Sequence, residues 1–480
     1  MASKPLALGA ISLLLIPAVA QAHFFGTVYR LPIPFWMYAY GASAALIVSF
    51  ALVAYFVSTP VAVASFKTLD LTHSPLASTL RRTRFGNVVR ATTVFTFTVA
   101  ILTGLYGNPN PFDNFCMSFF WIAFALALTY LSALVSDASA LMNPWQVMIA
   151  WLGRFRPASF SGRLAFPAWL GYWPGLGLYA LYIWIELFGH TQPRSLAMIL
   201  ISYTVITVSG AWLFGSRSWL CHGEIFSIGL KLIGKMAPVR CAPLQMRWPF
   251  IGLIRAHADR ASLVIFILFM LSSTAFDGAH ETLPWISLFW KGVYPVIGPL
   301  VARLSPRPYE TAASLYYAWQ WAMLVASPFI YYAIYLVFIS LTRRITKTDL
   351  TVQELSLRFA FSLIPIAFVY NVSHYYTLLI TEAPRLLAFL SDPFGNGWNL
   401  FGTRGLSTVT VVPSAGFVWH SQVWLILAGH IVSVWTAHMQ ALQIFATSRQ
   451  ATLSQLPMLV LMVAFTAIGL WILSLPIAPG

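Results

Sequence analysis

Histidine and acidic side chains gather in otherwise apolar stretches of the C-terminal half of this 480-residue chain. Asp277, His280 and Glu281 lie together in TAFDGAHETLPW. His374 lies in VYNVSHYY, and His420 begins a further apolar stretch. Imidazole and carboxylate groups bind Zn or Cu, and three of them leave a coordination position open for water or substrate. Ionisable side chains within membrane segments are functional candidates by default.

These residues lead us to expect a site for one divalent metal ion, Zn or Cu, beside a carboxylate that acts as a base. The expected metal ligands are His280, His374, His420 and His23. The expected catalytic groups are Asp277, Glu281 and Tyr370. Alternatively, the same side chains are separate residues at helix contacts or at the membrane surface, because no metal-ligand spacing motif joins them.

Three histidines share one apolar stretch: His420, His430 and His438, ten and eight residues apart. At about 100° per residue, the first and last have the same azimuth and His430 lies about 80° away. Such a column suits a proton path, a series of haem ligands, or three packing histidines bonded to carbonyl groups. Asn371, one turn before His374, is a further polar group expected within the membrane.

The composition decides the class of protein in which these residues act. Hydrophobic residues make up 59% of the chain and charged residues 9%, whereas a typical soluble domain has about 25% charged residues. Apolar runs of about twenty residues exclude disorder and a porin-type barrel, whose strands are shorter and alternate in polarity. The three cysteines form no CxxC pair and indicate no disulfide framework.

The chain begins with a pattern typical of a secretory signal. Residues 1–22 contain Lys4, an apolar stretch and a final Ala-Gln-Ala, which resembles a cleavage site. We predict a cleaved signal peptide at 1–22, followed by a single transmembrane helical domain at 23–480; the alternative is an uncleaved first helix. Cleavage would make His23 the N-terminal residue, whose α-amine and imidazole together form a chelate suited to Cu(II).

Ten further segments are long enough to cross about 30 Å of hydrocarbon. They lie near 35–58, 88–106, 115–136, 168–188, 195–215, 261–275, 318–341, 356–380, 419–439 and 456–476. The sequence therefore predicts an all-α, polytopic membrane helix bundle of about ten transmembrane helices. We also expect an amphipathic helix over 222–237 on the cytoplasmic surface, and two long outer loops over 276–317 and 381–418.

The distribution of positive charge predicts the orientation. With the mature N-terminus outside, the inner loops carry 20 Lys and Arg residues and the outer segments carry seven. Because cytoplasmic loops are enriched in Lys and Arg, this predicts a bacterial inner-membrane protein with both mature ends on the periplasmic side. The net charge of +15 is thus a topological signal. We expect a lipid bilayer as partner and no nucleic acid; the sequence indicates no particular protein partner.

Several stretches together resemble a family of bacterial polytopic membrane proteins, the fenitrothion hydrolases. They include LPIPFWMYAYGASAALIVSF, GYWPGLGLYALYIWIELF, STAFDG, SDPFGNGWNLFGT and QLPMLVLMVAFTAIGLWILS. The resemblance spans nearly the whole mature chain and implies hydrolysis of a small, lipophilic phosphotriester. A metal ion in such an enzyme would polarise the phosphoryl group and supply hydroxide. Its ligands would be drawn from Asp277, His280, His374 and His420, in a pocket between the sixth, eighth and ninth helices that opens to the outer face.

Two other classes of function remain open at this stage. Buried histidines and bent helices also suit a transporter of a small solute or a metal ion. The histidines would equally serve as cofactor ligands in a membrane partner of a respiratory or copper-delivery assembly. Standard catalytic motifs such as GxSxG, Walker A and HExxH are absent from the sequence.

Overall fold

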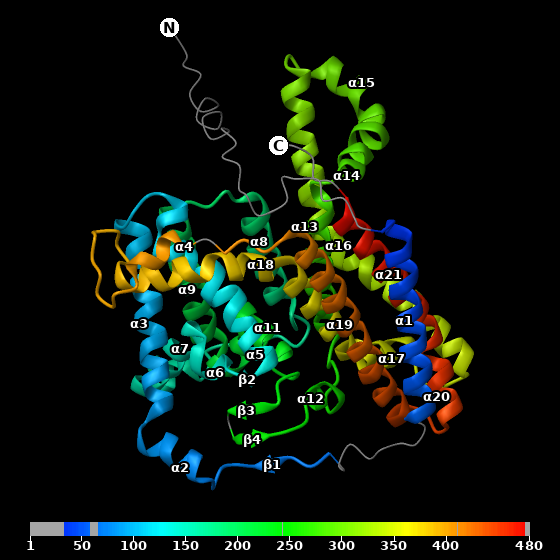
Figure 1. Ribbon diagram of the computed structural model, residues 1–480, viewed down its shortest axis with the longest axis horizontal. Coiled ribbons are helices and arrows are strands. Elements are labelled where there is room, and N and C mark those ends of the chain that lie inside the picture. The colour runs from blue at the N-terminus through cyan, green and yellow to red at the C-terminus, as the bar shows by residue number, and fades with distance from the viewer. Residues whose placement is uncertain (1–32, 58–65, 242, 410, 476–480) are drawn as a thin grey trace.

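A computed structural model describes residues 33–57, 66–241, 243–409 and 411–475. The predicted signal peptide, 1–22, and His23 lie outside these residues. The described chain consists of helices and one small sheet, and ten of its helical segments are long and apolar enough to cross a membrane. The predicted all-α, polytopic helix bundle is therefore confirmed (Figure 1).

The long elements are α1 (Phe35–Phe56), α3 (Phe85–Tyr106), α9 (Pro193–Phe214), α13 (Ala261–His280), α16 (Pro308–Thr346), α18 (Ile364–Ser391), α19 (Ala415–Ile444) and α21 (Leu456–Ser474). A further long helix, Phe115–Leu134, consists of α4 (Phe115–Ser118), the π-helical η3 (Phe119–Ala127) and α5 (Leu128–Leu134). The shorter helices are α2 (Pro75–Arg82), η2 (Pro111–Asp113), α6 (Ser139–Met142), α7 (Pro144–Phe155), η4 (Pro157–Phe160), α8 (Trp173–Phe188), α10 (Ser216–His222), α11 (Ile225–Ile233), α12 (Ile251–Ile254), α14 (Leu283–Ser287), η5 (Leu288–Val293), α15 (Tyr294–Leu304), α17 (Val352–Phe359), η6 (Ala360–Leu363), η7 (Arg404–Thr408) and α20 (Ser448–Ser454).

The predicted segment 168–188 begins later than expected, because a turn precedes α8, a helix of 16 residues. The backbone N–H of Tyr172 donates to the Ser262 hydroxyl, 3.1 Å away, near the start of α13. At the other end of α8, the Phe188 ring lies 5.7 Å from the His280 ring. α8 thus accompanies α13 along its whole length, although it is too short for the set of ten long apolar helices.

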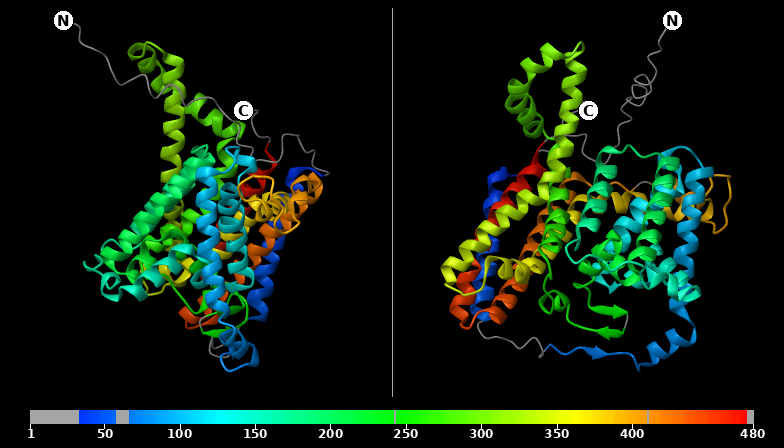
Figure 2. Two further views of the ribbon diagram at one scale, coloured as in Figure 1. Left: turned by 90° about the vertical axis from the view of Figure 1, so that its left-hand side faces the viewer. Right: turned by 180° about the vertical axis from the view of Figure 1, so that it is seen from behind.

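The predicted outer loop 276–317 is helical, which corrects that prediction. α13 continues to His280, and the chain then forms α14, η5 and α15. Residues 283–304 are long and apolar enough to cross a membrane. However, they pack against the N-terminal part of α16, and together they project beyond the rest of the bundle (Figure 1, Figure 2). α16 has 39 residues, about 58 Å at the usual helical rise, so it extends well past the hydrocarbon thickness.

The two ends of the described chain lie on the same side of the bundle. α1 begins and α21 ends near its upper edge, whereas α2 and the sheet lie at the opposite edge (Figure 1, Figure 2). A chain that crosses the membrane an even number of times returns to the side on which it began, which gives this arrangement. We name the edge where α1 begins the outer end and the opposite edge the inner end, following the orientation predicted from the charges.

This orientation makes a prediction for reporter fusions. Alkaline phosphatase fused to the C-terminus should be active, because the enzyme folds only where its disulfides can form, outside the cytoplasm. A fluorescent protein that matures only in the cytoplasm should stay dark at the same position. The reverse pattern would place α1 and α21 with their outer ends in the cytoplasm and would overturn the assignment made from Lys and Arg.

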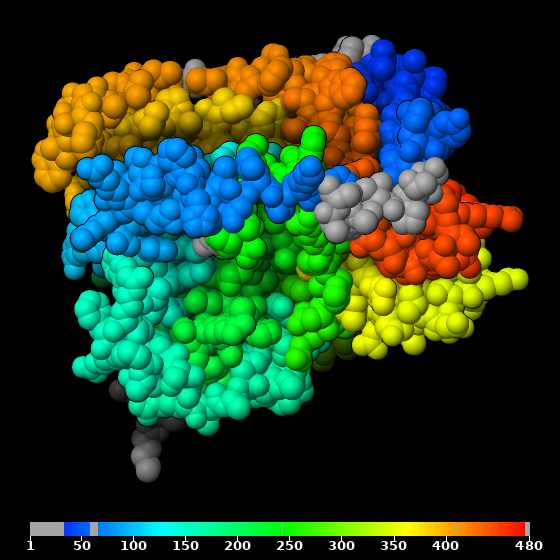
Figure 3. All heavy atoms as spheres, turned by 90° about the horizontal axis from the view of Figure 1, so that it is seen from below, coloured from blue at the N-terminus to red at the C-terminus, as the bar shows by residue number. Residues whose placement is uncertain are grey.

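A four-stranded sheet joins segments that are distant in sequence at the inner end. Its order is β1 (Leu69–Asp70), β4 (Leu244–Met246), β3 (Val239–Cys241) and β2 (Ser136–Asp137), with β2 and β3 parallel and the other pairs antiparallel. In Figure 3 the blue segment that contains β1 and α2 crosses this face beside the green residues that follow α11. The sheet thereby connects the inner ends of α3, α5 and α13.

The predicted amphipathic surface helix over 222–237 is wrong. α11 is short and packs against α5, α8 and α18, and most of its side chains are buried. Glu224 caps its first turn and is fully buried, where it accepts hydrogen bonds from Asn143 and Tyr203 at 2.8 and 2.7 Å. Burial lowers the pKa of Lys235, and Arg247 lowers it further. The Nζ atom of Lys235 lies 5.4 Å from the centre of the Phe361 ring, so this lysine is not part of a solvated cationic face.

α18 connects the two halves of the bundle. It packs against α13 and α19 of one half and against η3 and α4 of the other. Both figures of the ribbon show it lying across the upper part of the molecule (Figure 1, Figure 2). The predicted span 356–380 is extended to Ser391, so the second outer loop begins only at Asp392. α13 and the segment containing α17 and α18 are the most buried of the ten long helical segments, and they hold the site described next.

Candidate functional site

The last turn of α13 faces the middle of α18 through a histidine–aspartate pair. The Nε2 atom of His374 lies 2.7 Å from Oδ2 of Asp277. The two side chains are only 10% and 4% exposed. The sequence placed Asp277 just beyond the sixth helix and His374 two turns from the end of the eighth. Because both helices are longer than predicted, Asp277 is helical and His374 lies mid-helix.

Tyr375 and Glu186 adjoin the Asp277–His374 pair. The Tyr375 hydroxyl donates to Oδ2 of Asp277 at 2.6 Å, the same oxygen that faces His374. Glu186, near the outer end of α8, interacts with Tyr375, Asp277 and His374. Two carboxyl groups are thus held close together in a largely dehydrated place. Such an arrangement favours a bound proton or cation, since two unneutralised carboxylates would repel each other.

His280 and Glu281 lie at the edge of this cluster. Nδ1 of His280 is 2.8 Å from the backbone oxygen of Asp277 and 4.0 Å from its Oδ1. Its Nε2 is 3.9 Å from Oε1 of Glu281, whose side chain is 43% exposed. The His280 ring stacks on Phe276, with ring centres 5.5 Å apart, and meets Phe188 edge-on. Glu281 is therefore the acidic group through which the cluster approaches the surface.

The sequence of α13 explains how these groups reach one face. Ser273, Asp277 and His280 are spaced four and three residues apart, so they follow one another along a single side of the helix. All three are buried. Tyr179 of α8 approaches the Ser273 hydroxyl at 3.5 Å, and α18 contacts the Asp277 turn. α8, α13 and α18 thus form the site, with α8 in the place where the ninth helix was expected.

Several predicted site residues lie elsewhere. His420 is exposed, and its ring nitrogens lie 2.7 Å from the Gly416 oxygen and 3.4 Å from the Tyr38 hydroxyl. Tyr370 donates to the backbone oxygen of Phe465 at 3.1 Å and packs against α21. The backbone oxygen of Asn371 accepts a hydrogen bond from Tyr130, at 3.4 Å. His420, Tyr370 and Asn371 thus have hydrogen-bond partners of their own, and none of these partners belongs to the Asp277–His374 pair.

The other two histidines of α19 have separate environments. His438 is buried between the Val57 carbonyl, 2.9 Å from its Nε2, and the Gln455 amide, 3.0 Å from its Nδ1. His430 is fully buried, and its Nδ1 lies 2.8 Å from the Ile426 carbonyl, on its own helix. The three histidines therefore do not form a hydrogen-bonded column in the described structure. The packing interpretation fits His438 best.

The outer loop GNPNPFDNF forms turns, as its asparagines and prolines favour. The side chain of Asn108 accepts from the Asn110 backbone at 3.0 Å, and that of Asn110 accepts from the Phe112 backbone at 3.1 Å. Asp392 shapes the second outer loop in the same way, accepting from the backbones of Asn396 and Gly397 at 2.9 and 2.7 Å. The acids of these two loops, Asp113 and Asp392, thus have local structural partners: Asp113 accepts a hydrogen bond from the Asn110 side chain, and Asp392 accepts one from the Asn396 backbone.

The described residues do not complete the expected metal site. Nowhere in the described part of the chain do three or more His, Cys, Asp or Glu side chains converge closely enough to hold a metal ion. Asp277 and His374 supply two groups of the right type, and His280 and Glu281 lie one contact further out. A zinc hydrolase normally uses three protein ligands. His23, the remaining predicted ligand, lies outside the described residues.

Sequence reasoning missed the roles of Tyr375 and Glu186. Tyr375 directly follows His374 and lies in the same VYNVSHYY segment, but hydropathy gives no sign that its hydroxyl faces Asp277. Glu186 has no metal-ligand or catalytic motif around it in the sequence. It is the single acidic residue of the apolar stretch WPGLGLYALYIWIELF, and that isolation was the available signal.

Comparison with known proteins adds no further constraint on this site. No family model, no curated protein sequence and no solved structure matches the chain.

Proposed function

We propose that this protein is a membrane-embedded hydrolase of neutral, lipophilic phosphotriesters, with its active centre at the Asp277–His374 pair. The observation that carries the proposal is the 2.7 Å contact between these two buried side chains at the outer end of the bundle. The reaction class comes from the resemblance to fenitrothion hydrolases. A neutral triester partitions into the bilayer, so a site between membrane helices meets it at high local concentration.

The pair has the form of a general base held by a carboxylate. With the Asp277 oxygen facing Nε2 of His374, the imidazole carries its proton on Nε2, and Nδ1 is the basic nitrogen. In the proposed reaction Nδ1 removes a proton from water while the water oxygen attacks phosphorus. The aryloxide group leaves with the electrons of its bond to phosphorus and takes a proton from the imidazolium. General base catalysis of this kind typically contributes 10²–10⁴-fold in rate.

The surrounding residues have roles consistent with this reaction. Tyr375 donates to Asp277 at 2.6 Å and so fixes the carboxylate that orients His374. The rings of Phe276 and Phe188 lie within 5.7 Å of the His280 ring, and Trp285 packs edge-on against Phe276. Aromatic walls of this kind suit the aryl group of the ester through offset or edge-to-face contacts.

The expected Zn or Cu ion remains part of the proposal as a cofactor whose ligand set is incomplete in the described residues. Asp277 and His374 would supply two ligands, and a third would come from His280, Glu281 or His23. A bound ion would polarise the phosphoryl oxygen or sulfur and lower the pKa of a bound water. Proton transfer by His374 and its orientation by Asp277 need only these side chains, and metal analysis of the purified protein decides whether an ion takes part.

Substitution of His374 tests the proposal. Purified H374A in detergent should hydrolyse a nitrophenyl phosphotriester about 100-fold more slowly than the wild type, because the proposed base is lost. The coloured nitrophenolate product gives the rate directly. H73A is the matched control, since His73 is exposed near the inner end and should be dispensable.

Turnover in detergent also separates catalysis from transport, because a detergent solution has no compartments. Wild-type protein that fails to hydrolyse the ester, or equal losses in H374A and H73A, would remove the case for this active centre. Metal content measured on the same preparations should fall in H374A if the ion is bound there. Movement of a solute or proton into liposomes by protein that is inactive in detergent would favour the transporter.

A further inference from the structure

His430 has an unused ring nitrogen in the interior of the bundle. Its Nδ1 is occupied by the Ile426 carbonyl at 2.8 Å, which leaves Nε2 with a free lone pair. Nε2 is fully buried and makes no hydrogen bond with any described residue. Tyr370 meets the ring edge-on at 5.9 Å but directs its hydroxyl to Phe465. A buried polar atom without a partner is unfavourable and is uncommon in native proteins, so it calls for an occupant.

His430 faces a small cavity whose other polarisable groups are thioethers. The cavity lies between α13, α16, α18, α19 and α21, and its volume is about 20 Å³. Met458 and Met462 line it together with His430; the remaining wall is formed by Leu, Ile, Phe and Tyr side chains. The two methionines are four residues apart on α21, so their side chains lie on the same face of that helix.

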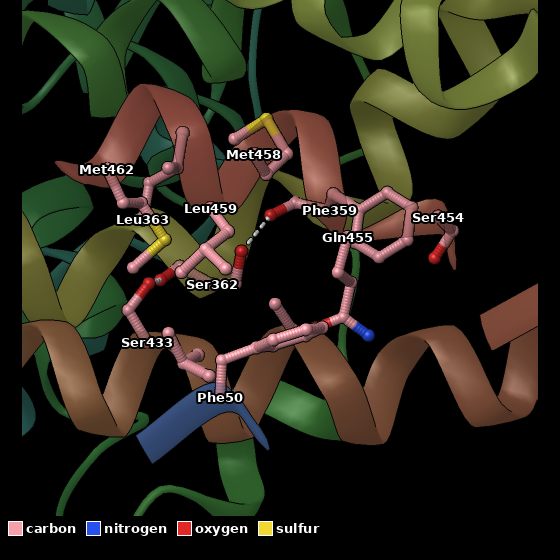
Figure 4. A pocket seen from close by; sticks show the side chains of 12 residues that line it. Phe50, Phe359, Ser362, Leu363, Ser433, Ser454, Gln455, Met458, Leu459 and Met462 are labelled. Carbon is pink, nitrogen blue, oxygen red and sulfur yellow. Dashed lines mark hydrogen bonds between the residues drawn. The ribbon is translucent and has the colours of Figure 1, made fainter. Parts of the chain in front are cut away.

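The same two methionines also border a second cavity of about 20 Å³ nearer the inner end, drawn in Figure 4. Both enter it from α21, opposite Ser362 and Ser433. These hydroxyls are already bonded, Ser362 to the Phe359 carbonyl at 2.7 Å and Ser433 to the Ser362 carbonyl at 2.5 Å. The thioethers of Met458 and Met462 are therefore the soft ligands that the two cavities share.

We propose that His430, Met458 and Met462 form a binding site for one soft monovalent metal ion, Cu(I). Thioether and imidazole groups are neutral, soft or borderline ligands that select Cu(I) over hard divalent ions. The cavity that His430 faces has no carboxylate among its lining residues, which disfavours Mg²⁺, Ca²⁺ and Mn²⁺. Its volume exceeds the roughly 10–15 Å³ that one water needs, so a single small occupant fits and an organic molecule does not.

This site is independent of the proposed phosphotriester site. Its residues belong to α19 and α21, and none of them takes part in the Asp277–His374 cluster. The two sites also differ in ligand type, because carboxylate and imidazole suit Zn(II) or Cu(II) whereas thioethers suit Cu(I). Failure of one proposal therefore leaves the other unaffected.

Cu(I) binding to the full-length protein in detergent tests the proposal. The thiols of Cys116, Cys221 and Cys241 are alkylated first under mild denaturation and refolding, or replaced by Ala, because thiolates also bind Cu(I). Competition with a chromophoric Cu(I) chelator under a reductant should then show one retained Cu(I) per chain. X-ray absorption of the copper should show nitrogen and sulfur neighbours in a ratio of one to two.

The variants M458L/M462L and H430F should each weaken Cu(I) retention at least tenfold, because each removes ligands while keeping the interior filled. M439L is the matched control, because Met439 is buried on α19 like His430 but lines neither cavity. The M439L protein should therefore bind Cu(I) with the same affinity as the wild type. Equal Cu(I) affinity in all four proteins would overturn the proposal, as would a wild type that retains no Cu(I) and holds only water. Loss of the copper in D277N but not in M458L/M462L would assign it to the outer cluster instead and would equally overturn it.

Discussion

Replacement of Asp277 by Asn is expected to reduce phosphotriester hydrolysis at least about 100-fold, the usual scale for losing an acid–base group. Asp277 holds the Nε2 side of His374 at 2.7 Å and accepts the Tyr375 hydroxyl at 2.6 Å. An amide in its place keeps the shape but presents an N–H donor or a neutral oxygen. The imidazole would then lose its fixed tautomer and the stabilisation of its charged form. Steady-state rates with a nitrophenyl triester measure the effect.

The matched control is E382Q, which makes the same carboxylate-to-amide change on α18. Glu382 pairs with Arg385 at 3.2 Å, one turn along the helix, and its side chain is 26% exposed. The activity of E382Q should stay within about twofold of the wild type, because this partly exposed pair lies outside the Asp277–His374 cluster and such pairs contribute little. If D277N kept wild-type kcat and KM, Asp277 would have no catalytic part, and the cluster would be a structural polar contact between helices.

The second large effect is expected on stability, at the crossing of α18 and α19. A Cβ atom added at Gly429 would meet the two methyl carbons of Val369 at 2.1 and 2.7 Å. Contacts this short require the two helices to separate. Small residues at such crossings are what allow membrane helices to approach closely. We expect G429A to lower the free energy of unfolding by roughly 1–3 kcal/mol, the usual cost of overpacking.

A thermal scan with a thiol-reactive fluorophore measures this change, since Cys116 is fully buried in the folded protein and becomes accessible on unfolding. The control is G177A in α8, where an added Cβ meets no atom within 4 Å. That variant should be as stable as the wild type or slightly more so, because alanine favours the helix by about 1 kcal/mol over glycine. A Tm for G429A equal to that of G177A would contradict the close approach of α18 and α19.

The sequence by itself determined the class of architecture. Apolar runs of about twenty residues with few charges predict membrane helices, because a helix satisfies every backbone polar group where no water is present. Helices occupy all ten predicted segments, within a few residues at most ends. The extensions at the C-terminal ends of α13 and α18, to His280 and Ser391, have a physical reason. Polar and charged residues lower the mean hydropathy, so a prediction from hydropathy ends the membrane segment there. The helix itself continues where it is packed against other parts of the protein.

The tertiary structure alone decided which polar residues meet. Asp277 and His374 were both candidates, yet so were His420 and Tyr370, and nothing in hydropathy distinguishes the four. The rotation of each helix about its axis and the oblique course of α18 set the outcome: His374 and Tyr375 face Asp277, while Tyr370 faces α21. Helix rotation depends on side-chain packing, such as the contact of Gly429 with Val369, and on partners far away in the sequence. Spacing along one helix predicts which residues share a face, but only the packing of several helices decides what each face meets.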